Sequence, residues 1–413
     1  MDKVNIAIIG AGASGLMCAS LLANNSKLNI SIFDKNLDGA KKLLITGNGR
    51  CNVTNLSDVD ELLNNIPHNS KFMFSALNNF SAYDMISYLS NNGVDYIVEQ
   101  NNRVFPKTNK AQTIKDMFES QLKNANNIKL HYGCNVESIE KTNNGFVVKS
   151  QGVEEQFNIV VVATGGLSYP LTGSSGDGLK FAKNLGILTT LTRPALCGFR
   201  IKNNPFKLLQ GVGLNVALSA ESNNTSLCNT AGDIMFTNFG VGGPAAFKLS
   251  SLIEYHSANG LNLIIDFIPN LTDVELELDI KQFIKQNPKK QLLSLLCSFV
   301  NEKVAGVICN FLEVEQNFQI ANLNLKHIKD IVNLLKHFKT TIESFDNIER
   351  ATVTRGGVDI KHINPATMQT KLYDNLFFIG EVLDVDAFSG GYNLQIAFST
   401  AAACAKQIIK IYG

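Results

Sequence analysis

The segment Val4-Asn5-Ile6-Ala7-Ile8-Ile9-Gly10-Ala11-Gly12-Ala13-Ser14-Gly15 decides the fold that we expect for this chain. A short apolar, β-rich run stops at Gly10, and apolar residues at helical spacing resume at Leu16. The segment therefore predicts a strand, a tight turn and a helix. In a GxGxxG turn, Gly10 forms the turn, Gly12 exposes bare backbone to a pyrophosphate, and Gly15 allows close packing of helix on strand.

A second apolar run completes a β-α-β unit. Leu28 to Phe33 predicts a strand that ends at Asp34, whose carboxylate can accept hydrogen bonds from ribose hydroxyls, and Lys35 follows it. The helix N-terminus near Ser14 would direct its N–H groups and partial positive charge at the phosphates. The alternative is a glycine-rich turn without a ligand, which the ordered series of strand, motif, helix, strand and acid disfavours. The unit predicts a dinucleotide but does not distinguish NAD from FAD.

Two later strands favour FAD. The run from Val160 to Ala163 ends in Thr164 and Gly165, and the run from Leu376 to Ile379 ends in Gly380 and Glu381. Large FAD enzymes use such strand ends to return the chain to the cofactor. A carboxylate such as Glu381 can hold hydroxyls of the ribityl chain, which FAD has and NAD lacks.

The pattern along the chain predicts an α/β protein with three domains. A discontinuous Rossmann-like FAD-binding domain would comprise residues 1–192 and 346–413, because the closing strand and helix return to the opening unit. A β-rich substrate domain would comprise 193–271 and 338–345, where short β-type segments dominate. Residues 272–337 have helical periodicity and predict a small helical insertion.

Composition narrows the class of protein. The 413 residues carry 37 Lys and Arg against 36 Asp and Glu, and a net charge of +1 lacks the basic excess typical of nucleic-acid binding. The 8 cysteines have no metal-ligand spacing, so we expect reduced thiols and no metal. No apolar run is long enough to span a membrane, and the glycines in Val4–Ala23 argue against an export signal. The expected location is the cytoplasm.

Several further blocks carry a family resemblance. They are Lys41–Asn55, Arg103–Pro106, Ala163–Pro170, Thr172–Gly178, Phe236–Pro244, Thr354–Asp359, Gly380–Asp386 and Gly390–Gln395. With them the chain resembles a bacterial family of NAD(P)/FAD-dependent oxidoreductases that includes bile-acid-reducing and aminoacetone-oxidising members. The resemblance implies the same three domains. Two departures are Lys41, where Arg is common, and Asn48, where Gly is expected and whose presence could alter the backbone of that loop.

The resemblance also assigns site residues. Lys41 and Lys42 would lie near the FAD phosphates or ribose, although a solvated pair is the alternative. The backbone of Val136 would meet the adenine. The block around Gly391, Asn393 and Leu394 precedes the last helix, so its N–H groups can point at the flavin O2 atom.

Two residues are candidates for catalysis. Arg50 could place a positive charge near the flavin N1 and C2 carbonyl and stabilise the reduced ring, or it could be a structural loop arginine. Tyr392 could donate a proton, or it could pack. Cys51 has no resolving partner nearby in the sequence and is expected to be a small buried thiol. The carboxylates Glu381, Asp384 and Asp386 form an acidic cluster that could suggest a metal, but no histidine matches them.

The expected function is hydride transfer through flavin N5. The leading hypothesis is reduction of an activated C=C bond or related acceptor in a small molecule. NAD(P)H would visit the flavin site, because no second strand-GxGxxG-helix unit follows residue 190. The alternatives are an oxidase of a small amine or aminoketone that produces hydrogen peroxide, and a flavin-containing RNA-binding protein or non-catalytic module. The sequence predicts no oligomeric state.

Overall fold

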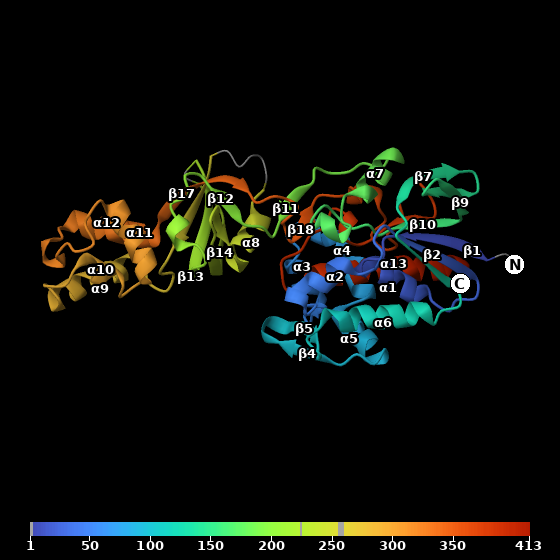
Figure 1. The fold of residues 1–413 in the computed structure, drawn as a ribbon, viewed down its shortest axis with the longest axis horizontal. Helices are drawn as coiled ribbons and strands as arrows, with labels where there is room; N and C mark the ends of the chain where they lie inside the picture. The colour runs from blue at the N-terminus through green and yellow to red at the C-terminus, as the bar shows by residue number, and fades with distance from the viewer. Residues whose placement is uncertain (1–2, 224, 255–259) are drawn as a thin grey trace. The chain divides into compact units, whose positions relative to one another are not determined.

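The computed structural model describes residues 3–223, 225–254 and 260–413. The chain divides into two compact units, Met1–Ala195 with Ile348–Gly413, and Leu196–Asn347 (Figure 1). The bounds of the first unit lie within a few residues of 1–192 and 346–413, the ranges that the sequence predicts for a discontinuous FAD-binding domain, and that domain assignment stays a prediction. The further division of the second unit into a β-rich and a helical domain stays a prediction.

A five-stranded parallel sheet forms the centre of the first unit, in the order β19-β10-β1-β2-β6. Its strands are β1 (Val4–Ile9), β2 (Leu28–Asp34), β6 (Ile128–Tyr132), β10 (Ile159–Val162) and β19 (Leu376–Phe378). The central strands are buried on both faces, which explains their nearly continuous Ile and Val runs. The predicted Rossmann-like fold is confirmed. All five strands run in one direction, so the residues that follow them gather at one edge.

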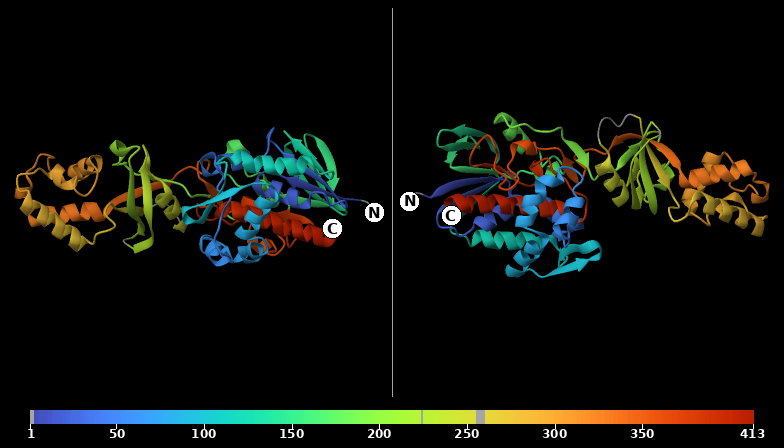
Figure 2. Two further views of the ribbon diagram at one scale, coloured as in Figure 1. Left: turned by 90° about the horizontal axis from the view of Figure 1, so that it is seen from below. Right: turned by 180° about the vertical axis from the view of Figure 1, so that it is seen from behind.

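Helices cover one face of this sheet. They include α1 (Ala13–Leu22), α6 (Ala111–Lys123) and α13 (Tyr392–Tyr412). Figure 2 shows α13, drawn in red, running beside α1, and the two helices are in direct contact. The first and last helices of the chain therefore lie in one layer.

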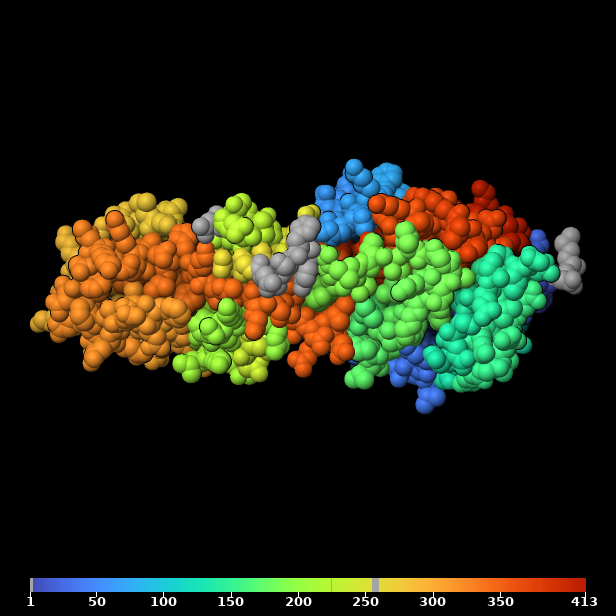
Figure 3. Space-filling view, turned by 90° about the horizontal axis from the view of Figure 1, so that it is seen from above, coloured from blue at the N-terminus to red at the C-terminus, as the bar shows by residue number. Residues whose placement is uncertain are grey.

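A three-stranded antiparallel sheet covers the opposite face. It consists of β7 (Val136–Thr142), β8 (Gly145–Ser150) and β9 (Val153–Phe157). The ring of Phe157 meets that of Phe33 edge-on, with centroids 5.9 Å apart, and so joins this sheet to β2. In the space-filling view these strands, in teal, and the green segment that follows β10 form much of the surface of the first unit (Figure 3).

Two elements differ from the sequence pattern. The strand-like run Ile128–Ile139 is split at Gly133, whose φ of +70° turns the chain out of the parallel sheet. The helical run Lys71–Asn91 is two helices, α4 (Ser70–Asn79) and α5 (Ala82–Asn91). Ser81 caps α5, because its side chain and that of Asp84 each accept a backbone N–H of the other residue.

Smaller elements complete the first unit. They are α2 (Lys41–Ile45), α3 (Val59–Asn64), α7 (Asp177–Asn184), β3 (Thr54–Asn55), β4 (Tyr96–Glu99), β5 (Arg103–Pro106), β11 (Arg193–Ala195) and β18 (Val353–Arg355). Strands β3, β5 and β4 form one small sheet, and β11 pairs with β18.

The second unit contains a closed antiparallel barrel in the order β12-β15-β14-β13-β16-β17. The strands are β12 (Phe199–Ile201), β13 (Gly213–Ser222), β14 (Thr225–Phe236), β15 (Gly240–Gly242), β16 (Leu261–Asp266) and β17 (Phe338–Phe345). The helices are α8 (Pro244–Leu252), α9 (Asp273–Gln286), α10 (Leu292–Leu296), α11 (Glu302–Leu312) and α12 (Leu325–Lys336). Its core includes the buried rings of Phe199, Phe206, Phe236 and Phe338. Among the described residues of both units, we find no helix with the length and apolar character needed to span a bilayer.

Candidate flavin site

The glycine turn after β1 has three different surroundings. A Cβ on Gly10, which has φ +108°, would lie 2.4 Å from the carbonyl oxygen of Ala163. A Cβ on Gly15 would lie 1.9 Å from the carbonyl oxygen of Gly10. A Cβ on Gly12 would meet no described heavy atom within 4 Å. Helix α1 begins here with no side-chain cap, so its first N–H groups face the open space beside Gly12.

Asp34 ties the end of β2 to this turn. Its Oδ2 accepts the N–H of Ala11 at 2.8 Å, and its Oδ1 accepts the N–H of Asn36 at 2.8 Å. Its carbonyl oxygen accepts the N–H of Cys134 at 2.9 Å, which brings the start of β7 and the buried Val136 to the same end of the sheet. A carboxylate accepts about four hydrogen bonds, so these contacts leave Asp34 able to accept from a ribose.

Lys35 is paired within the chain. Its Nζ donates to Asp177 at 2.5 Å and also to Ser175. Burial would raise the pKa of Asp177, but the hydrogen bond and charge of Lys35 outweigh burial and lower that pKa.

Glu381 is the centre of a polar network. Its Oε2 accepts from Lys42 Nζ at 2.6 Å, and its Oε1 accepts from Ser168 Oγ and the N–H of Thr354, both at 3.0 Å. Lys42 also donates to Ser168 Oγ at 2.6 Å. Lys41 begins the same short helix and is partly exposed. The network connects α2, the segment after β10, β18 and the residues that follow β19. The sequence pattern did not predict a role for Ser168 or Thr354 in this network.

The ends of β10 and β19 complete this edge. Gly380, with φ +74°, abuts Ser14, and its N–H donates to Thr400 Oγ1 of α13 at 3.0 Å. Gly165 lies against Ser174. The Oγ1 atom of Thr164, at the end of β10, is buried and has no hydrogen-bond partner among the described residues. Buried hydroxyls normally form hydrogen bonds, so this atom is a candidate to bind a ligand.

The N-terminus of α13 lies at this edge too. A Cβ on Gly391 would lie 2.4 Å from the Thr54 backbone, and the helix has no side-chain cap. The Asn393 side chain is used internally, since it accepts the N–H of Ala387 at 2.9 Å and donates to that residue's carbonyl at 2.7 Å. Leu394 is partly exposed. Tyr392 is buried, and burial raises the pKa of its hydroxyl.

Arg50 contacts a different group of residues from the other predicted site residues. Its guanidinium pairs with Glu99, donates from Nη2 to Asn109 Oδ1 at 2.6 Å, and lies 4.1 Å from the centre of the Phe105 ring. The hydrogen bond from Arg50 lowers the pKa of Glu99. These contacts favour the structural alternative for Arg50, and its role near the flavin stays a prediction.

The loop before Arg50 is left-handed. Asn48 has φ +57° and ψ +42°, a region that Asn tolerates better than most non-glycine residues. Asn48 therefore adopts a left-handed conformation, which is also favourable for the glycine that the resemblance predicts at this position. Cys51 is fully buried, as predicted, and burial raises its thiol pKa to about 12.

The structure separates the acidic cluster of the sequence. Glu381 binds Lys42, whereas Asp386 Oδ1 lies 3.6 Å from Arg355 Nε. Arg355 lies in one of the blocks that carry the resemblance, but its position in the sequence predicted no role for it.

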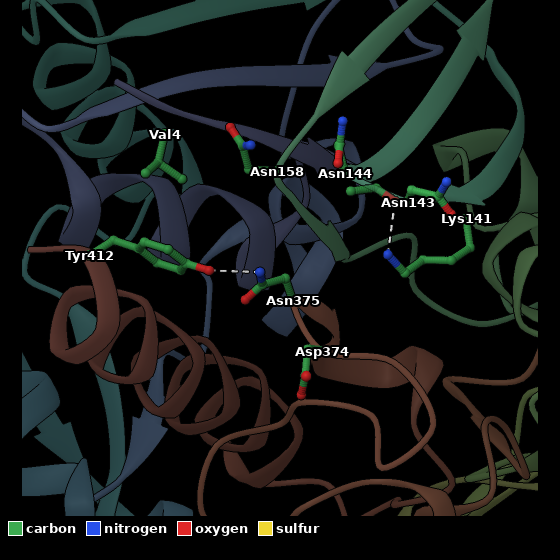
Figure 4. A pocket seen from close by; sticks show the side chains of 9 residues that line it. Val4, Lys141, Asn143, Asn144, Asn158, Asp374, Asn375 and Tyr412 are labelled. Carbon is green, nitrogen blue, oxygen red and sulfur yellow. Dashed lines mark hydrogen bonds between the residues drawn. The ribbon is translucent and has the colours of Figure 1, made fainter. Parts of the chain in front are cut away.

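A polar hollow lies at the opposite edge of the sheet. Figure 4 shows its lining near the start of β1 and the end of α13, and its volume is about 220 Å³. Asn375 donates to the Tyr412 hydroxyl at 2.7 Å across it. Because ligands of parallel sheets bind at the carboxyl ends of the strands, this hollow is distinct from the cofactor edge.

The residues at the carboxyl edge fit FAD. They offer open space at Gly12, two uncapped helix N-termini and a buried hydroxyl without a partner, all at one edge of the parallel sheet. This fold and edge define a Rossmann-type FAD-binding protein.

Residues 4–407 match the family model described as HI0933-like protein Rossmann domain, and the chain belongs to this family. It is 32% identical to a ribosomal RNA dihydrouridine synthase of Haemophilus influenzae, over 97% of each chain. It is 29% identical to the Escherichia coli protein of the same name, over 99% of each chain. It is 26% identical to a 3-dehydro-bile acid delta(4,6)-reductase of Clostridium scindens, over 96% of each chain.

A solved structure shows the same fold. The 3-ketosteroid delta1-dehydrogenase of Sterolibacterium denitrificans matches with a TM-score of 0.55 over 100% of both chains, at 14% identity. The predicted family and FAD dependence are thus confirmed, whereas the electron donor and acceptor require a proposal.

Proposed function

We propose that this FAD-dependent oxidoreductase reduces the C5=C6 double bond of a uridine in ribosomal RNA, with NADPH or NADH as the electron donor. The observation that carries the proposal is the similarity to two ribosomal RNA dihydrouridine synthases, at 32% and 29% identity, over almost the whole chain.

The chemistry agrees with the activated C=C acceptor expected from the sequence. The C5=C6 bond of uracil is conjugated to the C4 carbonyl, so a hydride can add at C6 and a proton at C5. The nicotinamide is oxidised, and the C=C bond becomes a C–C single bond. FAD supplies the hydride carrier between donor and acceptor when bound. The bile-acid relative is also named for the reduction of double bonds, which supports the reaction type.

An RNA substrate departs from the expectation that no nucleic acid is a partner. That expectation used the net charge of +1, which sums over the whole chain and does not describe where the charges lie. The similarity to RNA-modifying proteins is the more specific observation.

We assign FAD to the carboxyl edge of the sheet. The pyrophosphate would approach Gly12 and the N-terminus of α1, the ribose would meet Asp34, and the ribityl chain would meet Glu381, which Lys42 holds. The flavin would lie near the N-terminus of α13. The described residues of the second unit form an antiparallel barrel and helices, so we place the nicotinamide donor transiently at the flavin.

The decisive experiment compares ribosomal RNA from cells with and without the gene. Mass spectrometry of nucleosides should show dihydrouridine lost in the deletion strain and restored by the wild-type gene, but not by a Gly12→Val variant. Purified protein with NADPH and unmodified ribosomal RNA, under anaerobic conditions, should form dihydrouridine. Unchanged dihydrouridine in the deletion strain, together with no product in vitro, would refute the proposal.

The second candidate is reduction of a steroid-like enone, favoured by the similarity to the bile-acid reductase. Oxidation of NADPH by the purified protein upon addition of a 3-keto-4-ene steroid, with no response to RNA, would select this candidate.

A further inference from the structure

We propose that a basic surface of the first unit binds the phosphate backbone of the RNA substrate. Four cationic side chains around the hairpin of β4 and β5 form this surface: Arg50, Arg103, Lys107 and Lys110. The inference rests on the proposed function and adds to it the part of the protein that holds the RNA. Every nucleotide of RNA carries a negative charge, so cations that contact its phosphates contribute much of the affinity.

The sequence concentrates positive charge in this region. From residue 100 to residue 115 the chain contains four cations and no carboxylate side chain. One of the four, Lys115, is buried and pairs with Asp38 and Glu119. The other three belong to the basic surface. The net charge of +1 for the whole chain does not report this local excess.

The two arginines of the surface share their contacts. Glu99 pairs with Arg50 and, at 3.5 Å, with Arg103. Both guanidinium groups lie beside the buried ring of Phe105, at 4.1 Å and 5.8 Å from its centre. Contact with an aromatic ring favours a fixed orientation of a guanidinium. The arginines therefore present their charge from a defined position.

The two lysines are exposed and weakly paired. Lys107 Nζ lies 3.3 Å from Asp95, and the two side chains are 66% and 78% exposed, so water screens this pair. Lys110 is exposed, forms no ion pair among the described residues, and precedes α6, whose first turn contains no acidic residue. Asn109, which accepts a hydrogen bond from Arg50, lies beside Lys110 in the chain. These lysines can exchange water or a surface carboxylate for an RNA phosphate.

The surface adjoins the part of the first unit to which we assign the flavin. Arg103 lies opposite Asn55 in the pairing of β5 with β3. Asn55 is buried, and its Nδ2 donates to the carbonyl oxygens of Asn101 at 2.9 Å and Gly390 at 3.1 Å. Gly390 lies directly before the N-terminus of α13. RNA bound to the basic surface would therefore lie close to the cofactor edge.

The test removes three cations of this surface in the triple variant Arg103→Gln/Lys107→Gln/Lys110→Gln. Arg50 is left unchanged, because it is also a candidate for catalysis. The three replaced side chains are at least partly exposed, so the variant should bind FAD and unfold at the wild-type Tm. If the triple variant does not fold, the double variant Lys107→Gln/Lys110→Gln takes its place, since it retains the pair of Arg103 with Glu99.

The control removes the same charge from the second unit. It is the triple variant Lys285→Gln/Lys289→Gln/Lys290→Gln, whose lysines are exposed and form no ion pair among the described residues. The probe is unmodified ribosomal RNA, transcribed in vitro and labelled with a fluorophore. Fluorescence anisotropy gives its Kd at several salt concentrations, and dihydrouridine formation gives kcat and KM.

The triple variant of the basic surface should raise the Kd for RNA at least about tenfold at about 0.1 M salt, and the control less than about threefold. The loss of three phosphate contacts should also lower the slope of log Kd against log salt concentration by about 2. KM should rise while kcat stays within about twofold of wild type, because phosphate contacts position the RNA and take no part in hydride transfer.

The outcome also separates this inference from the proposed function. The basic surface alone is refuted if wild-type protein reduces RNA but the triple variant binds RNA within about twofold of wild type, or if the control loses as much affinity. Wild-type protein that neither binds nor reduces RNA would refute both the surface and the proposed function.

Discussion

Ser14 and Gly380 are in direct contact, although Ser14 lies in the first turn of α1 and Gly380 follows the last strand, β19. A Cβ on Gly380 would lie 2.5 Å from Ser14 Oγ and 2.9 Å from Ser14 Cβ. The contact joins the two ends of the chain at the carboxyl edge of the sheet, where we place FAD.

Replacing Gly380 with alanine should therefore destabilise the first unit. The new methyl group overlaps Ser14, and φ of +74° is unfavourable for alanine, so the free energy of unfolding should fall by about 2–4 kcal/mol. Denaturant unfolding measures this change. The double variant Ser14→Gly/Gly380→Ala should recover the part of the lost free energy of unfolding that comes from the overlap with Ser14, but not the part that comes from the unfavourable φ. A double variant no more stable than Gly380→Ala would show that the overlap is not the cause.

Gly12 and Gly15 should respond differently to substitution. Gly12→Val meets no described atom near its Cβ, so its apoprotein should unfold at the Tm of wild-type apoprotein, while the purified variant should retain less than about one tenth of its flavin. Gly15→Val forces its side chain against the carbonyl of Gly10 and should lower Tm by several degrees or abolish folding. Visible absorbance and thermal melts test both. Normal flavin content in Gly12→Val would contradict the pyrophosphate assignment.

The charge of Glu381 should matter for cofactor retention. Glu381→Gln keeps an oxygen for Ser168 and Thr354 but loses the ion pair with Lys42, so FAD affinity should fall about tenfold. The control is Glu277→Gln, which removes an exposed helical ion pair with Lys281 in the second unit. Fluorescence titration of apoprotein with FAD provides both Kd values. Equal Kd values for the two variants would argue against a role for Glu381.

Replacing Asn48 with glycine should leave the stability of the protein nearly unchanged, whereas a β-branched residue should destabilise it. Its φ of +57° is left-handed, so Asn48→Gly should change stability by less than about 1 kcal/mol, while Asn48→Val should cost about 1–2 kcal/mol. Urea unfolding of the two variants tests this. A stable valine variant would mean that the loop adopts another conformation.

Cys51 should be inert to alkylation at neutral pH. Burial raises its pKa to about 12, so the thiol is protonated below that pH and the reactive thiolate forms as the pH rises through it. Native protein treated with iodoacetamide at pH of about 8 should be labelled at the exposed Cys297 and not at Cys51, as peptide mass spectrometry would show. Labelling of Cys51 before unfolding would contradict the burial argument.

Much of the first unit was predictable because its signals are local. The alternation from a β-rich run to helical spacing around Gly10–Gly15, and the acid at Asp34, are set by short-range backbone preferences and packing. The same local pattern predicts one strand over Ile128–Ile139 and misses the break at Gly133, because the turn there separates two strands that join different sheets.

The sequence by itself thus determined the parallel sheet, the glycine turn and the class of cofactor. Tertiary structure alone decided the partners of the charged residues: Lys42 with Glu381, Arg355 with Asp386, and Arg50 with Glu99. The physical reason is that periodicity reports which face of an element is buried, whereas an ion pair between distant segments depends on how the whole chain brings their ends together.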